Sequence, residues 1–123
     1  MEEIAIVRCL QNASGAISKM RVLQAFKDVE NFRKILYYAL NPMLTYKISE
    51  QTLRTPVEYD PAITITMTDI FKICELLAKR KALDAATVYQ VRVFVQCLTD
   101  PESSEFYIEL LSKTLRLGVT PKT

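Results

Sequence analysis

Apolar side chains recur at intervals of three and four along most of this 123-residue chain, and that spacing places them on one face of an α-helix. Glycine occurs twice and proline five times, so the chain is poor in the residues that build turns and loops. Half of the residues are hydrophobic and 24% are charged, a globular composition that excludes a disordered chain. We therefore predict one all-α domain over residues 1–123, a compact bundle of about six helices.

The apolar spacing and the stop signals place the helices near residues 3–11, 18–28, 30–40, 68–81, 84–98 and 101–117. Ser18 is the expected N-cap of the second helix, and either Thr66 or Thr68 is expected to cap the fourth. Asp84 is expected to cap the fifth helix. Gly118 is expected to end the sixth, because glycine readily adopts the left-handed backbone found after helices.

The segment between the third and fourth helices, about residues 42–62, has no sustained period and contains Pro56 and Pro61. We interpret it as an irregular excursion. Residues 63–67 then alternate apolar and threonine side chains, which is typical of a strand. Because this run is only five residues long and has no obvious partner, we expect an extended lead-in to the fourth helix rather than a sheet.

Composition excludes several kinds of chemistry. The chain has no histidine, so it cannot hold a Ser-His-Asp triad, a Cys-His pair or a histidine zinc site. Two glycines cannot supply a P-loop or a dinucleotide-binding turn. The net charge of +2, from 16 basic and 14 acidic residues, is too small to require an anionic partner by itself. The distribution of cations therefore has to carry any argument for nucleic-acid binding.

The three cysteines, Cys9, Cys74 and Cys97, are odd in number and form no C-x-x-C pair. Each has apolar neighbours in sequence, so we predict three buried thiols in a reduced, cytoplasmic setting. No window approaches the roughly 18 apolar residues of a membrane span, and residues 1–10 lack the charge order of a signal peptide. We expect no membrane partner.

Four segments in chain order carry a resemblance to a known family. Ser-Gly at 14–15 with Lys19 is similar to an I-G-S-T-K opening, and I-T-I-T-M-T-D at 63–69 is similar to an x-L-T-L-T-D helix entry. K-R-K-A-L at 79–83, followed by Ala-Ala at 85–86, is similar to an x-R-K-L-T-G-N-A-A corner. L-R-L-G-V at 115–119 is similar to a closing segment. Taken in this order, they resemble the N-terminal helical DNA-binding domain of phage-type ATP-dependent DNA ligases.

The resemblance implies that this chain binds duplex DNA around a nick through phosphate and minor-groove contacts, without reading sequence. A downstream catalytic domain, requiring ATP and Mg²⁺, would then perform ligation in replication, repair and recombination. This chain lacks the Lys-x-Asp-Gly adenylation motif, so we expect it to be neither an enzyme nor a cofactor-binding protein by itself. The resemblance also implies a monomer in the cytoplasm of a bacterial or phage-infected cell.

The end of the sequence adds a further expectation. Thr120 followed by Pro121 is a helix-start signal two residues before the last, so we expect the natural protein to continue into a ligase catalytic domain. One departure from the family concerns the corner after residue 83, where the family has glycine and this sequence has Asp84. A carboxylate there weakens any phosphate contact at that turn.

Sequence-independent duplex binding requires cations and backbone amides directed at phosphates. The interhelical turn at residues 14–15, the cationic helix end at 79–81 and the cluster at 116–122 offer both, and the last is the strongest candidate. The predicted DNA contacts are Ser14, Gly15, Lys19, Lys47, Lys79, Arg80, Lys81, Arg116, Gly118, Thr120 and Lys122.

Two alternatives from other classes stay open. The chain could be a helical protein-interaction module that binds no nucleic acid, with its cations serving solubility. It could also be a small enzyme with a Ser–Lys pair, for which Ser18 with Lys19 and Ser112 with Lys113 are the candidates. Adjacent residues on a helix do not face each other, which argues against the enzyme.

Overall fold

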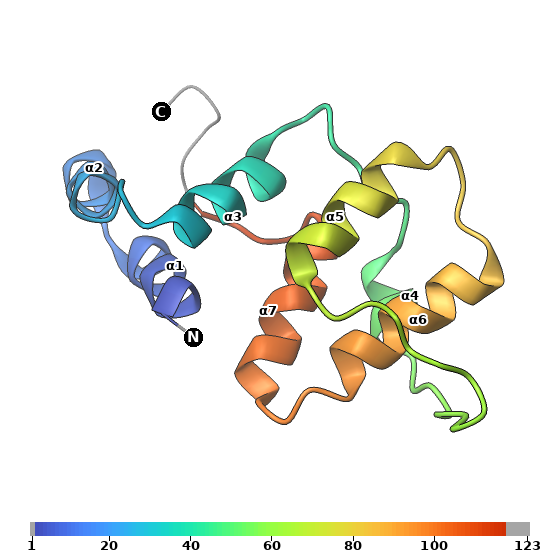
Figure 1. Cartoon of the computed structure of the whole chain (residues 1–123). Helices are drawn as coiled ribbons and strands as arrows, with labels where there is room; N and C mark the ends of the chain where they lie inside the picture. The colour runs from blue at the N-terminus through green and yellow to red at the C-terminus, as the bar shows by residue number, and fades with distance from the viewer. Residues whose placement is uncertain (1, 118–123) are drawn as a thin grey trace. The chain divides into compact units, whose positions relative to one another are not determined.

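The computed structural model describes residues 2–117, and this part of the chain contains seven α-helices and no strand (Figure 1). The helices are α1 (Glu2–Asn12), α2 (Gly15–Ala25), α3 (Glu30–Leu40), α4 (Glu50–Arg54), α5 (Ile70–Lys79), α6 (Ala85–Gln96) and α7 (Pro101–Ser112). The predicted all-α class is confirmed. The chain forms two compact units: residues 2–42 with 115–117, called the first unit, and residues 43–114, called the second unit.

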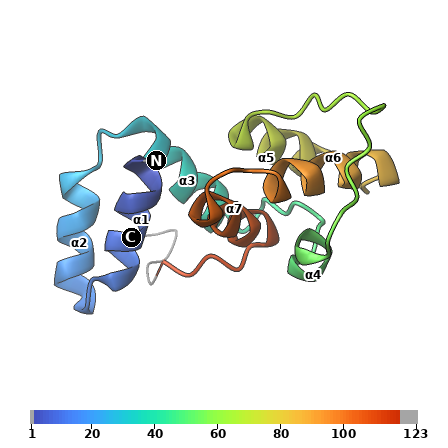
Figure 2. The same ribbon diagram turned by 90° about the horizontal axis from the view of Figure 1, so that it is seen from below.

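The first unit is built on α1, which packs against both α2 and α3 (Figure 2). Ile4, Val7 and Leu10 of α1 are buried at helical spacing. The α3 helix buries Phe32 and Ile35 in the same way. The predicted ranges of these two helices agree with the structure to within a residue or two.

The second helix differs from its prediction in both its start and its packing. It begins at Gly15, so Ser14 occupies the N-cap position and the predicted cap, Ser18, lies inside the helix. The φ of +82° at Gly15 turns the chain directly into α2. The connection between the first two helices is therefore shorter than the gap between the predicted ranges 3–11 and 18–28. The face expected to be core is also not buried: α2 has no buried residue, and Met20 is 52% exposed.

The second unit brings α4, α6 and α7 into mutual contact. Asp84 caps α6 as predicted, with its Oδ1 accepting a hydrogen bond from the Thr87 amide at 2.7 Å. The prediction that Thr66 or Thr68 caps α5 is wrong. Asp69 caps α5 instead, accepting from the Phe71 amide at 2.8 Å, because the preceding residues stay extended.

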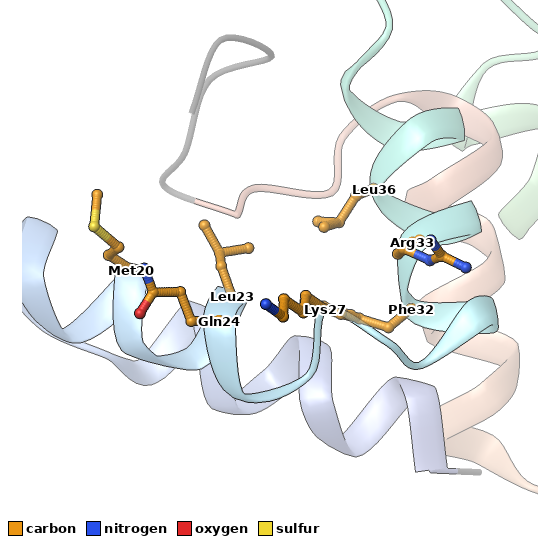
Figure 3. Close-up of a pocket in the computed structure, with 7 residues that line it drawn as sticks. All are labelled: Met20, Leu23, Gln24, Lys27, Phe32, Arg33 and Leu36. Atoms are coloured by element: carbon orange, nitrogen blue, oxygen red, sulfur yellow. The ribbon is translucent and has the colours of Figure 1, made fainter.

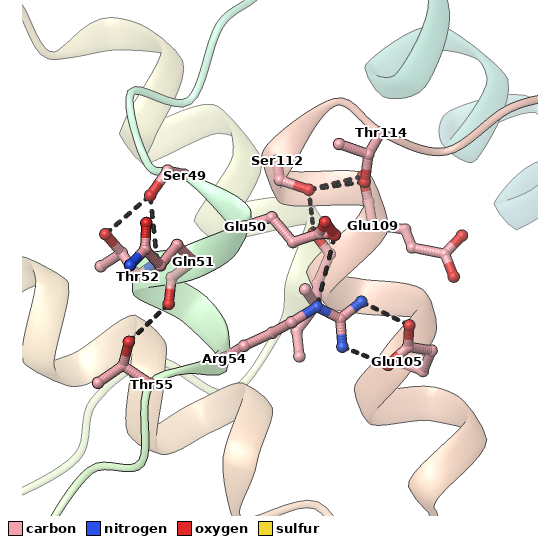
Figure 4. Close-up of polar contacts among 11 residues, drawn as sticks. Ser49, Glu50, Gln51, Thr52, Arg54, Thr55, Glu105, Glu109, Ser112 and Thr114 are labelled. Carbon is pink, nitrogen blue, oxygen red and sulfur yellow. Dashed lines mark hydrogen bonds and ion pairs between the residues drawn. The ribbon is translucent and has the colours of Figure 1, made fainter.

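The irregular excursion contains a helix that the sequence did not predict. Ser49 caps α4 by accepting from the Thr52 amide at 3.1 Å, and Arg54 at its end makes a forked pair with Glu105 of α7, at 2.7 and 2.5 Å (Figure 4). Leu53 is fully buried. Five residues are too few for an apolar period to appear, which is why seven helices replace the predicted six within residues 2–117.

Side chains of α6 satisfy the backbone of the remaining excursion. Gln96 donates to the carbonyl oxygens of Leu53 and Thr55, at 2.9 and 2.7 Å, and accepts from the Val57 amide at 3.0 Å. Gln90 holds the predicted strand-like run by donating to Thr64 O at 2.8 Å and accepting from the Thr66 amide at 3.0 Å. A helix thus supplies the hydrogen bonds that a neighbouring strand would supply in a sheet. The predicted extended lead-in is confirmed.

The last helix ends earlier than predicted. Its C-cap is Lys113, with a left-handed φ of 61°, and the Thr114 amide donates back to Glu109 O at 2.9 Å. This arrangement satisfies the terminal carbonyl groups without glycine. Residues 114–117 are not helical, and Gly118, the predicted stop, lies outside the described residues.

We predict that Leu53→Ala destabilises the protein by about 2–5 kcal/mol, because it leaves a cavity where α4 meets α6 and α7. Urea unfolding followed by circular dichroism measures this. Met43→Ala is the control, since Met43 is 87% exposed. Equal, small effects for both variants would show that α4 does not anchor the excursion.

We also predict that stability falls in acid through the caps of α6 and α7. Hydrogen bonds from the Thr87 side chain and amide lower the pKa of Asp84 below 3.8, and those from the Ser103 hydroxyl and Glu102 amide lower the pKa of Asp100. A folded-state pKa below the unfolded one stabilises the fold above the unfolded pKa, and this contribution is lost as the pH falls through the folded pKa. The urea midpoint should therefore drop below about pH 4. Replacing both residues by asparagine, which still caps, should flatten that drop, and an unchanged pH profile would contradict the assignment.

Candidate nucleic-acid interface

One basic cluster forms where α1 meets α2 in the first unit, and we call Ser14, Gly15, Lys19 and Arg116 the α1–α2 corner. Gln11 donates from Nε2 to the backbone oxygen of Arg116 at 2.8 Å, which ties residue 116 to the end of α1. Lys19 donates from Nζ to Leu10 O at 3.1 Å, which places its ammonium at the same helix end. The structure therefore brings together predicted contacts that lie about a hundred residues apart in sequence.

The N-terminus of α2 in this corner differs from those of α5, α6 and α7. Ser14 makes no side-chain cap hydrogen bond, and the first turn of α2 holds no acidic residue. In contrast, Asp69, Asp84 and Asp100 place carboxylates on the first amides of α5, α6 and α7. Backbone amides at a helix start attract anions, and a carboxylate already seated there repels them. The start of α2 is therefore suited to a phosphate oxygen.

A second basic cluster lies in the second unit, and we call Lys47, Lys79, Arg80 and Lys81 the α5 end. Lys47 has a left-handed φ of 60° and donates from Nζ to Leu77 O at 3.2 Å and to Ala78 O at 3.5 Å. The ammonium thus caps the last carbonyl groups of α5 and lies beside the cationic run that follows. These hydrogen bonds fix the position of the Lys47 side chain in the fold.

The cations of the α5 end are not equally free to meet an anion. Arg80 lies 3.8 Å from the Asp84 carboxylate and donates to Thr87 Oγ1 at 3.2 Å. Within residues 2–117, no hydrogen bond or ion pair holds the side chains of Lys79 or Lys81, and both residues are exposed. Asp84 therefore offsets one of these three cations.

Of the remaining predicted DNA contacts, only Arg116 lies among the described residues. Arg116 is exposed between the buried residues Leu115 and Leu117, so its side chain points to solvent. Gly118, Thr120 and Lys122 lie outside the described residues. Arg8 was missed: its guanidinium donates to Gln11 Oε1 at 2.8 Å and adds a cation to the α1–α2 corner. The spacing of three between Arg8 and Gln11 is compatible with a contact on one helix face. The contact of Gln11 with residue 116 is a tertiary contact, which the sequence does not indicate.

The predicted burial of all three cysteines is wrong for two of them. Cys74 is buried, whereas Cys9 and Cys97 are exposed. Apolar neighbours in sequence point to other faces of a helix, so they do not indicate burial. Within residues 2–117, no three histidine, cysteine or acidic side chains are grouped as a metal site would require.

Comparisons with known proteins add no family: no family model, no curated protein and no solved structure matches this chain. No helix among the described residues is both long and apolar enough to cross a membrane.

We predict that two thiols react quickly with Ellman's reagent in the folded protein and one reacts only on unfolding. Burial raises the pKa of Cys74 to about 12, which removes the reactive thiolate at neutral pH. Cys74→Ala should leave the fast amplitude at two thiols, and Cys9→Ala should reduce it to one. Fast reaction of a single thiol in the unaltered protein would contradict the exposure of Cys9 or Cys97.

Proposed function

We propose that this chain binds duplex DNA without sequence preference and holds a nick for an ATP-dependent ligase catalytic core. The observation that carries the proposal is the start of α2. Its N-cap residue, Ser14, makes no side-chain cap hydrogen bond, and Lys19 and the backbone of Arg116 both contact the end of the preceding helix, α1. Amides and cations of this kind bind phosphate oxygens and carry no sequence information. The resemblance in segment order supplies the ligase part of the proposal.

Each unit contributes its own cluster to this proposed binding. The α1–α2 corner offers backbone amides together with Lys19 and Arg116. The α5 end offers Lys79 and Lys81, whose side chains make no hydrogen bond or ion pair within residues 2–117. Lys19 also donates to Leu10 O, and two arginines are engaged elsewhere in the fold. Arg54 is paired with Glu105, and Arg92 donates to the carbonyl oxygens of Thr55 and Pro56. The proposed contacts are therefore a minority of the 16 basic residues.

In this proposal, DNA binding and the ligation reaction belong to different domains of a longer protein. This chain has no Lys-x-Asp-Gly, so the lysine that would accept AMP belongs to the proposed downstream domain. ATP and Mg²⁺ would bind that domain. Minor-groove contact by this chain would leave the two ends of the nick accessible to it.

We predict weak binding to nicked duplex, with a Kd on the order of 10⁻⁴ to 10⁻⁶ M at physiological salt. About four neutralised phosphates give a slope of log K against log salt of roughly −3 to −4. Arg116→Ala should weaken binding equally on unrelated sequences and reduce the slope by about one. Fluorescence anisotropy over a salt series measures both quantities.

Matched variants test which cations take part. Lys34→Ala removes the same charge but at a residue 3.7 Å from Glu30, so it should change the slope little. Lys79→Ala and Lys81→Ala, tested singly, should each reduce the slope more than Arg80→Ala, since Asp84 already offsets Arg80. The same slope for the unaltered chain, Arg116→Ala and both lysine variants would contradict the proposal.

A further inference from the structure

The α2 helix carries an apolar face that is not buried in the described part of the chain. None of its eleven residues is buried, although Ile17, Met20 and Leu23 recur along it at a spacing of three. Ile17 is 72% exposed and Met20 is 52% exposed. An apolar stripe left in water lacks the free energy that burial supplies, and contiguous exposed apolar surface is typical of a docking site.

This face forms one wall of a groove within the first unit. A cavity of about 400 Å³ lies between α2 and α3, with Met20 and Leu23 on one side and Phe32 and Leu36 on the other (Figure 3). A second cavity of about 290 Å³ reaches Ile17 and shares Met20 and Gln24 with the first. The two cavities therefore make one continuous apolar surface, which we call the α2–α3 groove.

The rim of the α2–α3 groove is cationic. Lys27 and Arg33 line the larger cavity and Arg21 lines the smaller, and no acidic residue lines either one. Asp28 and Glu30 lie in and just after the α2–α3 connection, but they contribute no lining atoms. An apolar floor with three cations around it is complementary to an apolar stripe flanked by carboxylates.

We propose that the α2–α3 groove binds an acidic amphipathic helix of a partner protein. A helix presents apolar side chains at i, i+3 or i+4, and i+7 to a groove of this kind. Carboxylates beside that stripe then meet Arg21, Lys27 and Arg33. The exposed methionine suits such a surface, because its flexible side chain adapts to different apolar shapes.

The same charges argue against two other occupants. A second copy of this chain would bring its own three cations to the same groove, and like charges facing each other are unfavourable. A DNA backbone would satisfy the rim but would place phosphates over an apolar floor, which gains nothing from them. The groove is thus a site separate from the proposed DNA contacts, and it contains none of their residues.

The test uses two labelled peptides of about 14 residues, long enough to span the groove as helices. Both carry leucine at helical spacing among alanines, one with glutamate and one with lysine at the flanking positions. Fluorescence anisotropy with the whole chain should show binding of the glutamate peptide at least about tenfold tighter than that of the lysine peptide. Equal affinities would overturn the proposal.

Two variants separate the floor from the rim. Met20→Lys adds a cation but removes apolar contact, so it should weaken binding of the glutamate peptide about tenfold. Met43→Lys is the matched control, because Met43 is an 87% exposed methionine of the second unit. Lys27→Glu with Arg33→Glu should reverse the preference in favour of the lysine peptide. Circular dichroism checks that each variant folds. Binding that tightens in Met20→Lys would show charge attraction alone and overturn the proposal.

Two further outcomes would assign the groove differently. A dimer in light scattering that Met20→Lys dissociates would show that a second copy occupies it. Competition between unlabelled nicked duplex and the glutamate peptide, lost on replacing Lys27 and Arg33, would show that the rim binds phosphates. Weaker DNA binding by Arg116→Ala with intact peptide binding would support this proposal, because the two sites share no residue, and it would stand even if the chain bound no DNA.

Discussion

Backbone groups at helix ends are the constraint on which this structure depends. An α-helix leaves its first four amides and last four carbonyl groups without internal partners. The helices of residues 2–117 have five to twelve residues, so end groups are a large share of the hydrogen-bonding capacity. Asp69, Asp84 and Asp100 at amide ends, and Lys19 and Lys47 at carbonyl ends, all satisfy such groups. Capping is therefore a recurring requirement of this fold.

The solutions follow a rule of charge. Aspartates take the amide ends of α5, α6 and α7, and lysines take the carbonyl ends, with Lys19 on α1 and Lys47 on α5. Each charge opposes the helix dipole that it meets. The start of α2 departs from this rule, since the Ser14 side chain accepts no hydrogen bond from a helix amide and the first turn holds no acidic residue. The first amides of α2 therefore lack the side-chain anion found at the starts of α5, α6 and α7, which is why we propose an external anion there.

Much of the fold was predictable because apolar spacing survives in helices of ten residues or more. The five-residue α4 was not predictable, and neither was the end of α7, where Lys113 adopts the backbone expected of glycine. The candidate site was predictable as a set of cations but not as two clusters. Gln11 joins Arg116 to the start of the chain, and Asp84 offsets Arg80, and both contacts depend on tertiary structure.

The α2 helix shows where periodicity alone misleads. Its apolar spacing resembles that of α3, yet α3 buries Phe32, Ile35 and Tyr38 while α2 buries nothing. The spacing of apolar residues indicates that a helix has an apolar face. Whether that face is buried depends on the tertiary packing of the other helices. Both α2 and α3 pack on α1. Among the described residues, a unit of three short helices does not enclose every apolar side chain, and Ile17 and Met20 of α2 stay exposed.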